Sequence, residues 1–100
     1  MEKLYYIFMS LKAESDLQKI IMYINNNLKE PNIAKKYLKM IKQEIKTLEA
    51  FPKKFAIIDK FNTRRLIIEN YSVFYEICEE SKTVYIKRIL YSASDWENKI

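Results

Sequence analysis

The sequence predicts an α+β fold, in which an N-terminal strand is followed by a two-helix antiparallel hairpin and a three-stranded antiparallel meander completes one sheet. Three observations carry this prediction. A short bulky run comes first, apolar residues then recur at helical spacing, and the last third alternates between β-branched or aromatic runs and short polar breaks. One hundred residues are the length of one domain, so we expect a single domain over residues 1–100.

The first strand and the first helix adjoin at Ser10. Leu4–Met9 is aromatic and bulky, which is the pattern of a buried strand. From Leu11 the period becomes helical, because an apolar residue returns at every third or fourth position. The residues on this face are Ala13, Leu17, Ile20, Ile21, Ile24 and Leu28.

The second helix is expected to begin at Pro31 and to end before Pro52. Proline suits the first turn of a helix, whereas Pro52 disfavours helical backbone at the residue before it. The short loop between the helices makes them antiparallel neighbours. The apolar stripe is Ala34, Tyr37, Leu38, Ile41, Ile45 and Leu48, and the exposed side carries Lys35, Lys36, Lys39, Lys42 and Lys46.

Three strands are expected after an irregular connection, at about residues 64–69, 72–78 and 83–91. The breaks at Glu69-Asn70 and Glu79–Lys82 are short enough for hairpins. The chain contains no glycine, so we expect its turns to be made by Asn, Asp, Ser or Pro. The polar tail, Ser92–Ile100, forms either a short helix or a loose end. Alternation places four residues on one face of the middle strand, namely Tyr71, Val73, Tyr75 and Ile77.

Composition narrows the classes of function. The net charge of +5 and the pI of about 9.2 favour an anionic partner, either nucleic acid or an acidic protein. Because glycine and histidine are both absent, glycine-rich phosphate loops, Cys–His nucleophiles and histidine-based zinc sites are excluded. The carboxylates show no clustered ligand spacing, so no metal and no other cofactor is expected.

Cysteine usage and hydropathy bear on location. The one cysteine, Cys78, cannot form an intramolecular disulfide, which fits a reducing cytoplasm. The apolar run Leu4–Met9 is too short for a signal peptide or a membrane span. We therefore predict a cytoplasmic protein without a membrane partner.

Four segments are specific in combination: Ala13–Leu17 at the start of the first helix, Phe51-Pro52 after the second, Arg64–Ile68 followed by Asn70-Tyr71 and Phe74-Tyr75, and Ile89–Trp96 near the end. This combination resembles the RelE/ParE superfamily of toxins from bacterial type II toxin–antitoxin systems. The resemblance implies a toxin whose activity is held off by a cognate antitoxin protein. It leaves two targets open, because RelE-like members cut messenger RNA in the ribosomal A site and ParE-like members poison DNA gyrase on the same fold.

The resemblance to RelE-like members implies a set of residues for RNA cleavage. Attack of a ribose 2′-OH on the adjacent phosphate needs a base, cations for the developing charge and a proton donor. Guanidinium groups bind phosphate as a fork, and the terminal tyrosine stacks a base or donates a proton. The catalytic residues so implied are Arg64, Arg65, Arg88 and Tyr91, and the nucleic-acid-binding residues are Lys53, Lys54 and Lys87.

Strand geometry constrains these candidates. On a regular strand Arg64 and Arg65 point to opposite faces, so only one of them can face a given site. By the same rule Arg88 shares a face with Ile86 and Leu90.

Three positions depart from the pattern of RNA-cleaving relatives. Leu90 stands where many have histidine, Ser72 where an arginine is common, and Ala93-Ser94 where a basic pair often follows the last strand.

The favoured function is a ribosome-dependent, metal-independent mRNA endonuclease. The alternative is a ParE-like gyrase inhibitor without nuclease activity, for which the helix lysines and the tail should matter more than the strand arginines. A basic module that only binds an acidic partner is a third possibility.

Overall fold

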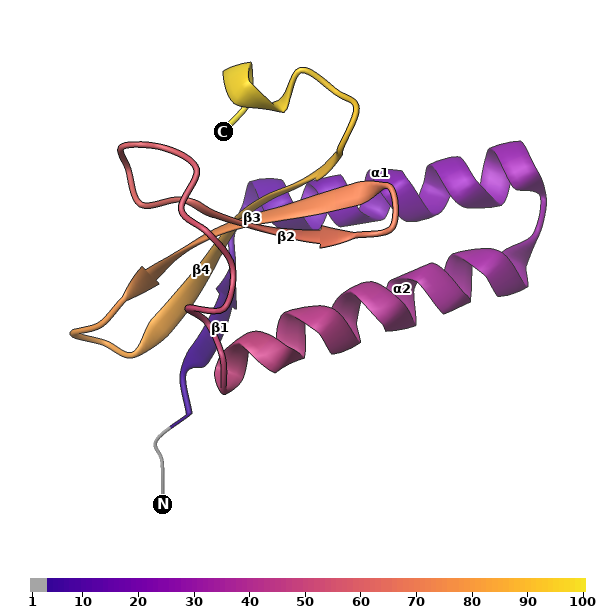
Figure 1. The fold of residues 1–100 in the computed structure, drawn as a ribbon. Helices are drawn as coiled ribbons and strands as arrows, with labels where there is room; N and C mark the ends of the chain where they lie inside the picture. The colour runs from indigo at the N-terminus through magenta and orange to yellow at the C-terminus, as the bar shows by residue number, and fades with distance from the viewer. Residues whose placement is uncertain (1–3) are drawn as a thin grey trace.

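The computed structural model describes residues 4–100 and has the α+β architecture that the sequence predicts. Two helices lie against one face of a sheet, and the chain ends on the opposite face (Figure 1). The elements are β1 (Tyr6–Met9), α1 (Leu11–Leu28), α2 (Pro31–Lys46), β2 (Arg64–Ile68), β3 (Tyr71–Cys78) and β4 (Thr83–Tyr91), with short 3-10 helices at Thr47–Glu49 and Trp96–Asn98.

The four strands form one mixed sheet in the order β1-β4-β3-β2. The meander β2-β3-β4 is antiparallel as predicted, and β1 joins it by pairing in parallel with β4. The first and last strands of the chain are thus neighbours, and α1 follows β1 after a single residue, Ser10. This connection places the start of α1 against β4.

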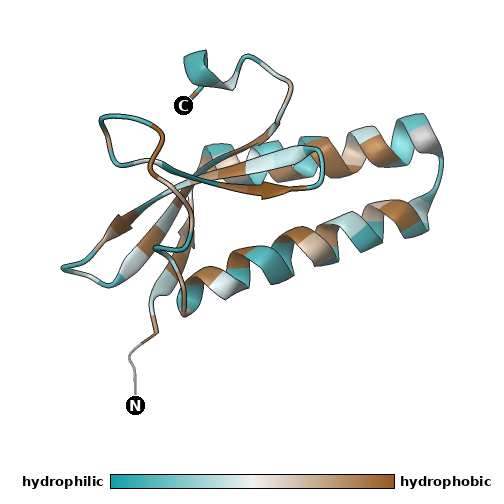
Figure 2. Cartoon of the chain, viewed as in Figure 1, coloured by the Kyte–Doolittle hydropathy of each residue, from teal (hydrophilic) through white to brown (hydrophobic). Residues whose placement is uncertain are grey.

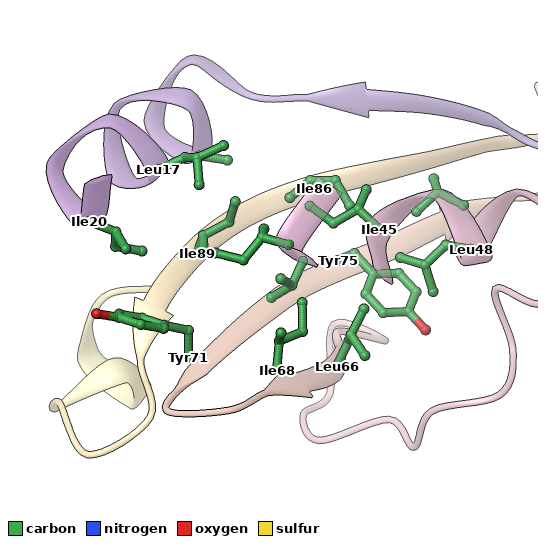
Figure 3. Packing of buried hydrophobic residues seen from close by; sticks show 14 of the residues in the cluster. Leu17, Ile20, Ile45, Leu48, Leu66, Ile68, Tyr71, Tyr75, Ile86 and Ile89 are labelled. Carbon is green, nitrogen blue, oxygen red and sulfur yellow. The ribbon is translucent and has the colours of Figure 1, made fainter. Parts of the chain in front are cut away.

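The core lies between the helices and the sheet. From β3, the predicted face of Tyr71, Val73 and Tyr75 is buried against the helices. Figure 3 shows the side chains of both helices meeting those of β2, β3 and β4 in this layer. The labelled members are Leu17, Ile20, Ile45, Leu48, Leu66, Ile68, Tyr71, Tyr75, Ile86 and Ile89. The predicted apolar stripe of α1 joins the same layer, apart from Leu28, whose side chain lies outside what the structure describes.

Ser10 joins the first helix to the sheet. Its Oγ accepts a hydrogen bond from the backbone N–H of Ala13 at 3.0 Å, which satisfies one of the free donors in the first turn of α1. The same hydroxyl donates to the carbonyl of Lys87 on β4 at 2.9 Å. One side chain therefore caps α1 and fixes its start against β4, an inner strand of the sheet.

Residues that are not typical of turns supply the left-handed backbone. Positive φ angles occur at Lys29 (52°), Asn62 (63°), Glu69 (53°) and Lys82 (51°). Asparagine adopts this region readily, but for the other three residues it costs about 1–2 kcal/mol each. The expectation that Asn, Asp, Ser and Pro make every turn was therefore wrong at Lys29, Glu69 and Lys82. The chain has no glycine, so lysine and glutamate adopt the left-handed backbone at these three positions.

Neither helix in residues 4–100 combines the length and the apolar character that a membrane crossing requires.

Replacing Ser10 tests its double role. We expect Ser10→Ala to lower the free energy of unfolding by about 1–2 kcal/mol, because it removes an N-cap and a hydrogen bond to β4. Urea denaturation measures this loss. The matched control is Ser15→Ala, which changes an exposed serine inside α1 and should be neutral or slightly stabilising. Equal stability of the two variants would contradict the assignment.

Candidate functional site

Arg64, the first of the predicted catalytic residues, holds a loop in place. Its Nη1 donates to the carbonyl of Phe55 at 2.6 Å and to that of Lys53 at 3.2 Å. Its cross-strand neighbour Tyr75 is fully buried and donates its hydroxyl to the carbonyl of Pro52 at 2.6 Å. Burial raises the pKa of Tyr75 to about 12. Arg64 and Tyr75 together anchor residues 52–55 to the sheet.

Arg65 lies on the opposite face of the sheet, as strand alternation predicts, and contacts the C-terminal tail. Its Nε donates to Ser72 Oγ at 2.9 Å. Its guanidinium carbon lies 4.7 Å from the ring centroid of Trp96 and 5.9 Å from that of Phe74. Since the rings of Phe74 and Trp96 are themselves 5.0 Å apart, Arg65 is part of a stacked cluster that holds the tail on the sheet.

A β-bulge sets the position of Arg88. Phe74 pairs with Arg88, whereas Tyr75 pairs with Ile86, so Lys87 is the extra residue on β4. The prediction that Arg88 shares a face with Ile86 was therefore wrong, because the bulge shifts the alternation by one residue. Arg88 and Arg65 both flank Phe74, on the face away from the core.

Arg88 is held by a bidentate ion pair. Its Nε and Nη2 donate to the two carboxylate oxygens of Asp16 at 2.7 and 2.8 Å. The Asp16 side chain is only 7% exposed and also accepts the backbone N–H of Ile89 at 3.0 Å. The hydrogen bonds that Arg88 donates to Asp16 raise the pKa of Arg88. The remaining Nη1 donates to the carbonyl of Lys99 at 3.0 Å, so Arg88 connects α1, β4 and the tail.

The three predicted nucleic-acid-binding lysines lie in different surroundings. Lys53 forms an ion pair with Glu79 at 3.1 Å. Lys54 lies over the ring of Phe55 at 5.6 Å. Lys87 donates to the buried hydroxyl of Thr63 at 2.9 Å and lies 3.9 Å from a carboxylate oxygen of Glu76.

Tyr91 is the one predicted catalytic residue that faces an open groove. Its side chain is 50% exposed, and its ring makes an edge contact with Tyr71 at 5.8 Å. Tyr71 makes a second edge contact with Tyr37 at 6.2 Å, and burial raises the pKa of Tyr71. The groove has a volume of about 500 Å³ and lies between α1 and the ends of β3 and β4. Its polar and aromatic lining includes Lys19, Tyr23, Tyr37, Asn70, Tyr71 and Tyr91.

The predicted catalytic set is divided between the two faces of the sheet. Arg65 and Arg88 come together around Phe74, under the tail, while Arg64 and the groove of Tyr91 lie on the helix side. All three guanidinium groups donate to side chains or carbonyls of the chain itself. Among residues 4–100 no cluster of three cysteine or acidic side chains has the arrangement of a metal site.

Sequence reasoning missed the partners of these residues. Asp16 occupies an ordinary position in the first turns of a helix, and nothing in the pattern marks it as the acceptor for Arg88, which is 72 residues away. Ser72 appeared only as a departure from RNA-cleaving relatives, yet it is fully buried between Arg65 and the hydroxyl of Ser92 at 2.8 Å. The presence of a single tryptophan in the tail did not indicate that Trp96 packs against Arg65 and Phe74.

Comparisons with known proteins agree with this fold. The model of the family described as the ParE toxin of the type II toxin–antitoxin system parDE matches residues 7–96. A chain of the chromosomal ParDE system from P. aeruginosa superimposes with a TM-score of 0.76 at 23% identity, covering 88% of this chain and 96% of that one. No curated protein matches the sequence.

Two further solved structures share the fold at lower identity. The toxin–antitoxin complex RelBE2 from Mycobacterium tuberculosis gives a TM-score of 0.61 at 20% identity, over 88% of this chain and 98% of that one. A mutant of the E. coli toxin RelE in the free state gives 0.66 at 10% identity, over 96% and 92%.

Removing the partner of the buried Asp16 carboxylate should destabilise the fold. We expect Arg88→Met to lower the free energy of unfolding by about 3 kcal/mol, because it leaves that charge unpaired. The double variant Asp16→Asn/Arg88→Met should recover most of the loss, because asparagine still accepts from the N–H of Ile89 and no charge is buried. Chemical denaturation of both variants measures the difference. If Arg88→Met proved as stable as the double variant, the ion pair would not be structural.

Glu79 should make stability depend on acid pH. Hydrogen bonds from Lys82, Tyr5 and Lys53 lower the pKa of Glu79 to about 2. A depressed carboxyl pKa contributes stability above the unfolded value near 4.5, and that contribution is lost as pH falls from there toward 2. We expect Glu79→Gln to lower the melting temperature at pH 6 and to have little effect near pH 2. Thermal denaturation across this range, with the exposed neighbour Glu80→Gln as control, checks the result, and a pH-independent effect would count against it.

Proposed function

We propose that this chain, which belongs to the family of ParE toxins of type II toxin–antitoxin systems, arrests growth by inhibiting DNA gyrase. The observation that carries the proposal is the match of the ParE family model, which spans 7–96 of the 100 residues. The greatest structural similarity among the three solved relatives described above is to the ParDE chain, with a TM-score of 0.76. This supports the gyrase alternative over the mRNA nuclease that the sequence favoured.

The state of the arginines supports the same choice. Cleavage at a phosphate needs cations that are free to meet the developing negative charge and a group that moves a proton. The chain has no histidine, and its three arginines are engaged with Phe55, Ser72 and Asp16. Using Arg88 or Arg65 on a substrate would require breaking contacts that hold the tail and α1.

Messenger RNA cleavage is the second candidate, and one observation favours it. Tyr91 is half exposed beside Tyr71, in a groove that also contains Lys19. Aromatic rings next to a cation suit the stacking of an unpaired base. In this rival function Tyr91 is the residue that contacts RNA, and Arg64, Arg65 and Arg88 are its predicted catalytic partners.

A cognate antitoxin is the expected protein partner. The similar chains from P. aeruginosa and M. tuberculosis come from a ParDE toxin–antitoxin system and a RelBE2 toxin–antitoxin complex. The net charge of +5 on this chain suits a partner with an acidic segment. A partly disordered segment of the antitoxin that folds as it binds the helices and the sheet of this chain would give a tight, regulated complex.

A supercoiling assay separates the two functions. We expect the purified chain to block negative supercoiling of relaxed plasmid by gyrase plus ATP, while relaxation by topoisomerase I proceeds normally. Arg65→Lys, which keeps the positive charge beside Trp96, should inhibit as the parent chain does, because no catalytic guanidinium is needed.

The rival nuclease function is tested by mapping new RNA 5′ ends in cells after brief induction of the chain. Normal supercoiling, together with discrete cuts inside translated codons that vanish for Tyr91→Ala, would overturn the gyrase proposal in favour of the nuclease.

A further inference from the structure

Four lysines form a straight stripe along α2. Lys35, Lys39, Lys42 and Lys46 are spaced four, three and four residues apart. At 100° per residue they lie within an arc of about 60° on the helix, and they extend along about 17 Å of its axis. Figure 2 shows hydrophilic and hydrophobic bands alternating along α2, whose buried residues are Ala34, Ile41 and Ile45. We call these four residues the lysine stripe.

The lysine stripe is free of internal partners. All four side chains are exposed, and the ion pairs found among residues 4–100 involve Lys53, Lys82, Lys87 and Arg88 instead. The acidic residue within α2, Glu44, lies on the opposite side of the helix, about 170° from the centre of the stripe. Lys42 also lines a groove between the two helices whose lining includes Glu14 of α1, but no ion pair joins these two residues. A concentrated positive charge is thus presented to solvent.

The surface around the lysine stripe has no apolar anchor. None of the large hydrophobic side chains that are exposed in residues 4–100 belongs to α2. The shallow groove beside the stripe is lined by its four lysines together with Leu38 and Gln43, and Leu38 is half-buried. Protein interfaces are depleted in lysine and obtain their affinity from buried aromatic, apolar and arginine side chains. This surface therefore fits a partner that is recognised by charge alone.

We propose that the lysine stripe binds the phosphate backbone of duplex DNA. Each strand of the duplex presents one phosphate per ~3.4 Å of helix axis, so a stripe of about 17 Å faces roughly five phosphates. Lysine is a flexible point charge, which suits contacts that fix position without reading bases. The binding is therefore independent of sequence and sensitive to salt.

DNA binding by the lysine stripe is a different property from gyrase inhibition. DNA binding by α2 needs no contact with gyrase and holds or fails whatever the target of the toxin is. If both hold, the toxin reaches gyrase on the DNA that gyrase is handling.

The test is fluorescence anisotropy of the purified full chain with a labelled duplex of about 20 base pairs and no other protein. With four phosphate contacts, the affinity should fall about 100-fold between 50 and 200 mM salt. The stripe variant replaces Lys35, Lys39, Lys42 and Lys46 by Gln. We expect it to bind at least tenfold more weakly at about 50 mM salt and to lose most of the salt dependence.

A second variant with the same net charge makes the test specific. It replaces four other exposed lysines, Lys12, Lys29, Lys60 and Lys99, by Gln and should weaken binding by less than about threefold. Circular dichroism confirms that both variants are folded. Equal weakening in the two variants would overturn the proposal, because it would reduce the effect to overall charge. Failure of the folded parent chain to bind duplex at about 50 mM salt would overturn it as well, and would leave an acidic protein as the partner of the stripe.

Discussion

The carboxylate of Asp16 connects the three parts of the molecule that meet at the end of the sheet. It accepts from Arg88 through both oxygens and from the backbone N–H of Ile89, and Arg88 in turn holds the carbonyl of Lys99. Helix α1, strand β4 and the tail therefore share one nearly buried charge pair. Because an unpaired carboxylate is costly in that environment, α1 cannot separate from β4 without breaking this pair, whereas release of the tail removes only the hydrogen bond to Lys99.

Most of the fold follows from local patterns, and the remainder depends on pairings between distant residues. The period of apolar residues located both helices, and alternation identified the buried face of Tyr71, Val73 and Tyr75 on β3. Local patterns could not show that β1 pairs with β4, or that Lys87 forms a bulge, because both depend on residues far apart in the chain. The turns at Lys29 and Glu69 were predicted, but the left-handed backbone of these two residues was not, since neither residue type prefers it.

The candidate site was less predictable than the fold. Alternation placed Arg64 and Arg65 on opposite faces, but it could not supply their partners, the carbonyl of Phe55 and the hydroxyl of Ser72. The same local sequence is compatible with an arginine that binds phosphate and with an arginine that holds a loop in place. Only the surrounding contacts tell them apart, and those contacts involve segments whose position no motif encodes. Tyr91 differs because it ends the last strand, and side chains at strand ends tend to remain accessible.

The position of Trp96 has a consequence for observing this protein in solution. It is the only tryptophan in the chain, and its ring lies 4.7 Å from the guanidinium carbon of Arg65 and 5.0 Å from the ring of Phe74. The intrinsic indole fluorescence therefore arises from the point where the tail meets the sheet. Any partner that lifts the tail moves this ring into water and shifts its emission to longer wavelength, so tail release can be followed in real time on the unlabelled protein.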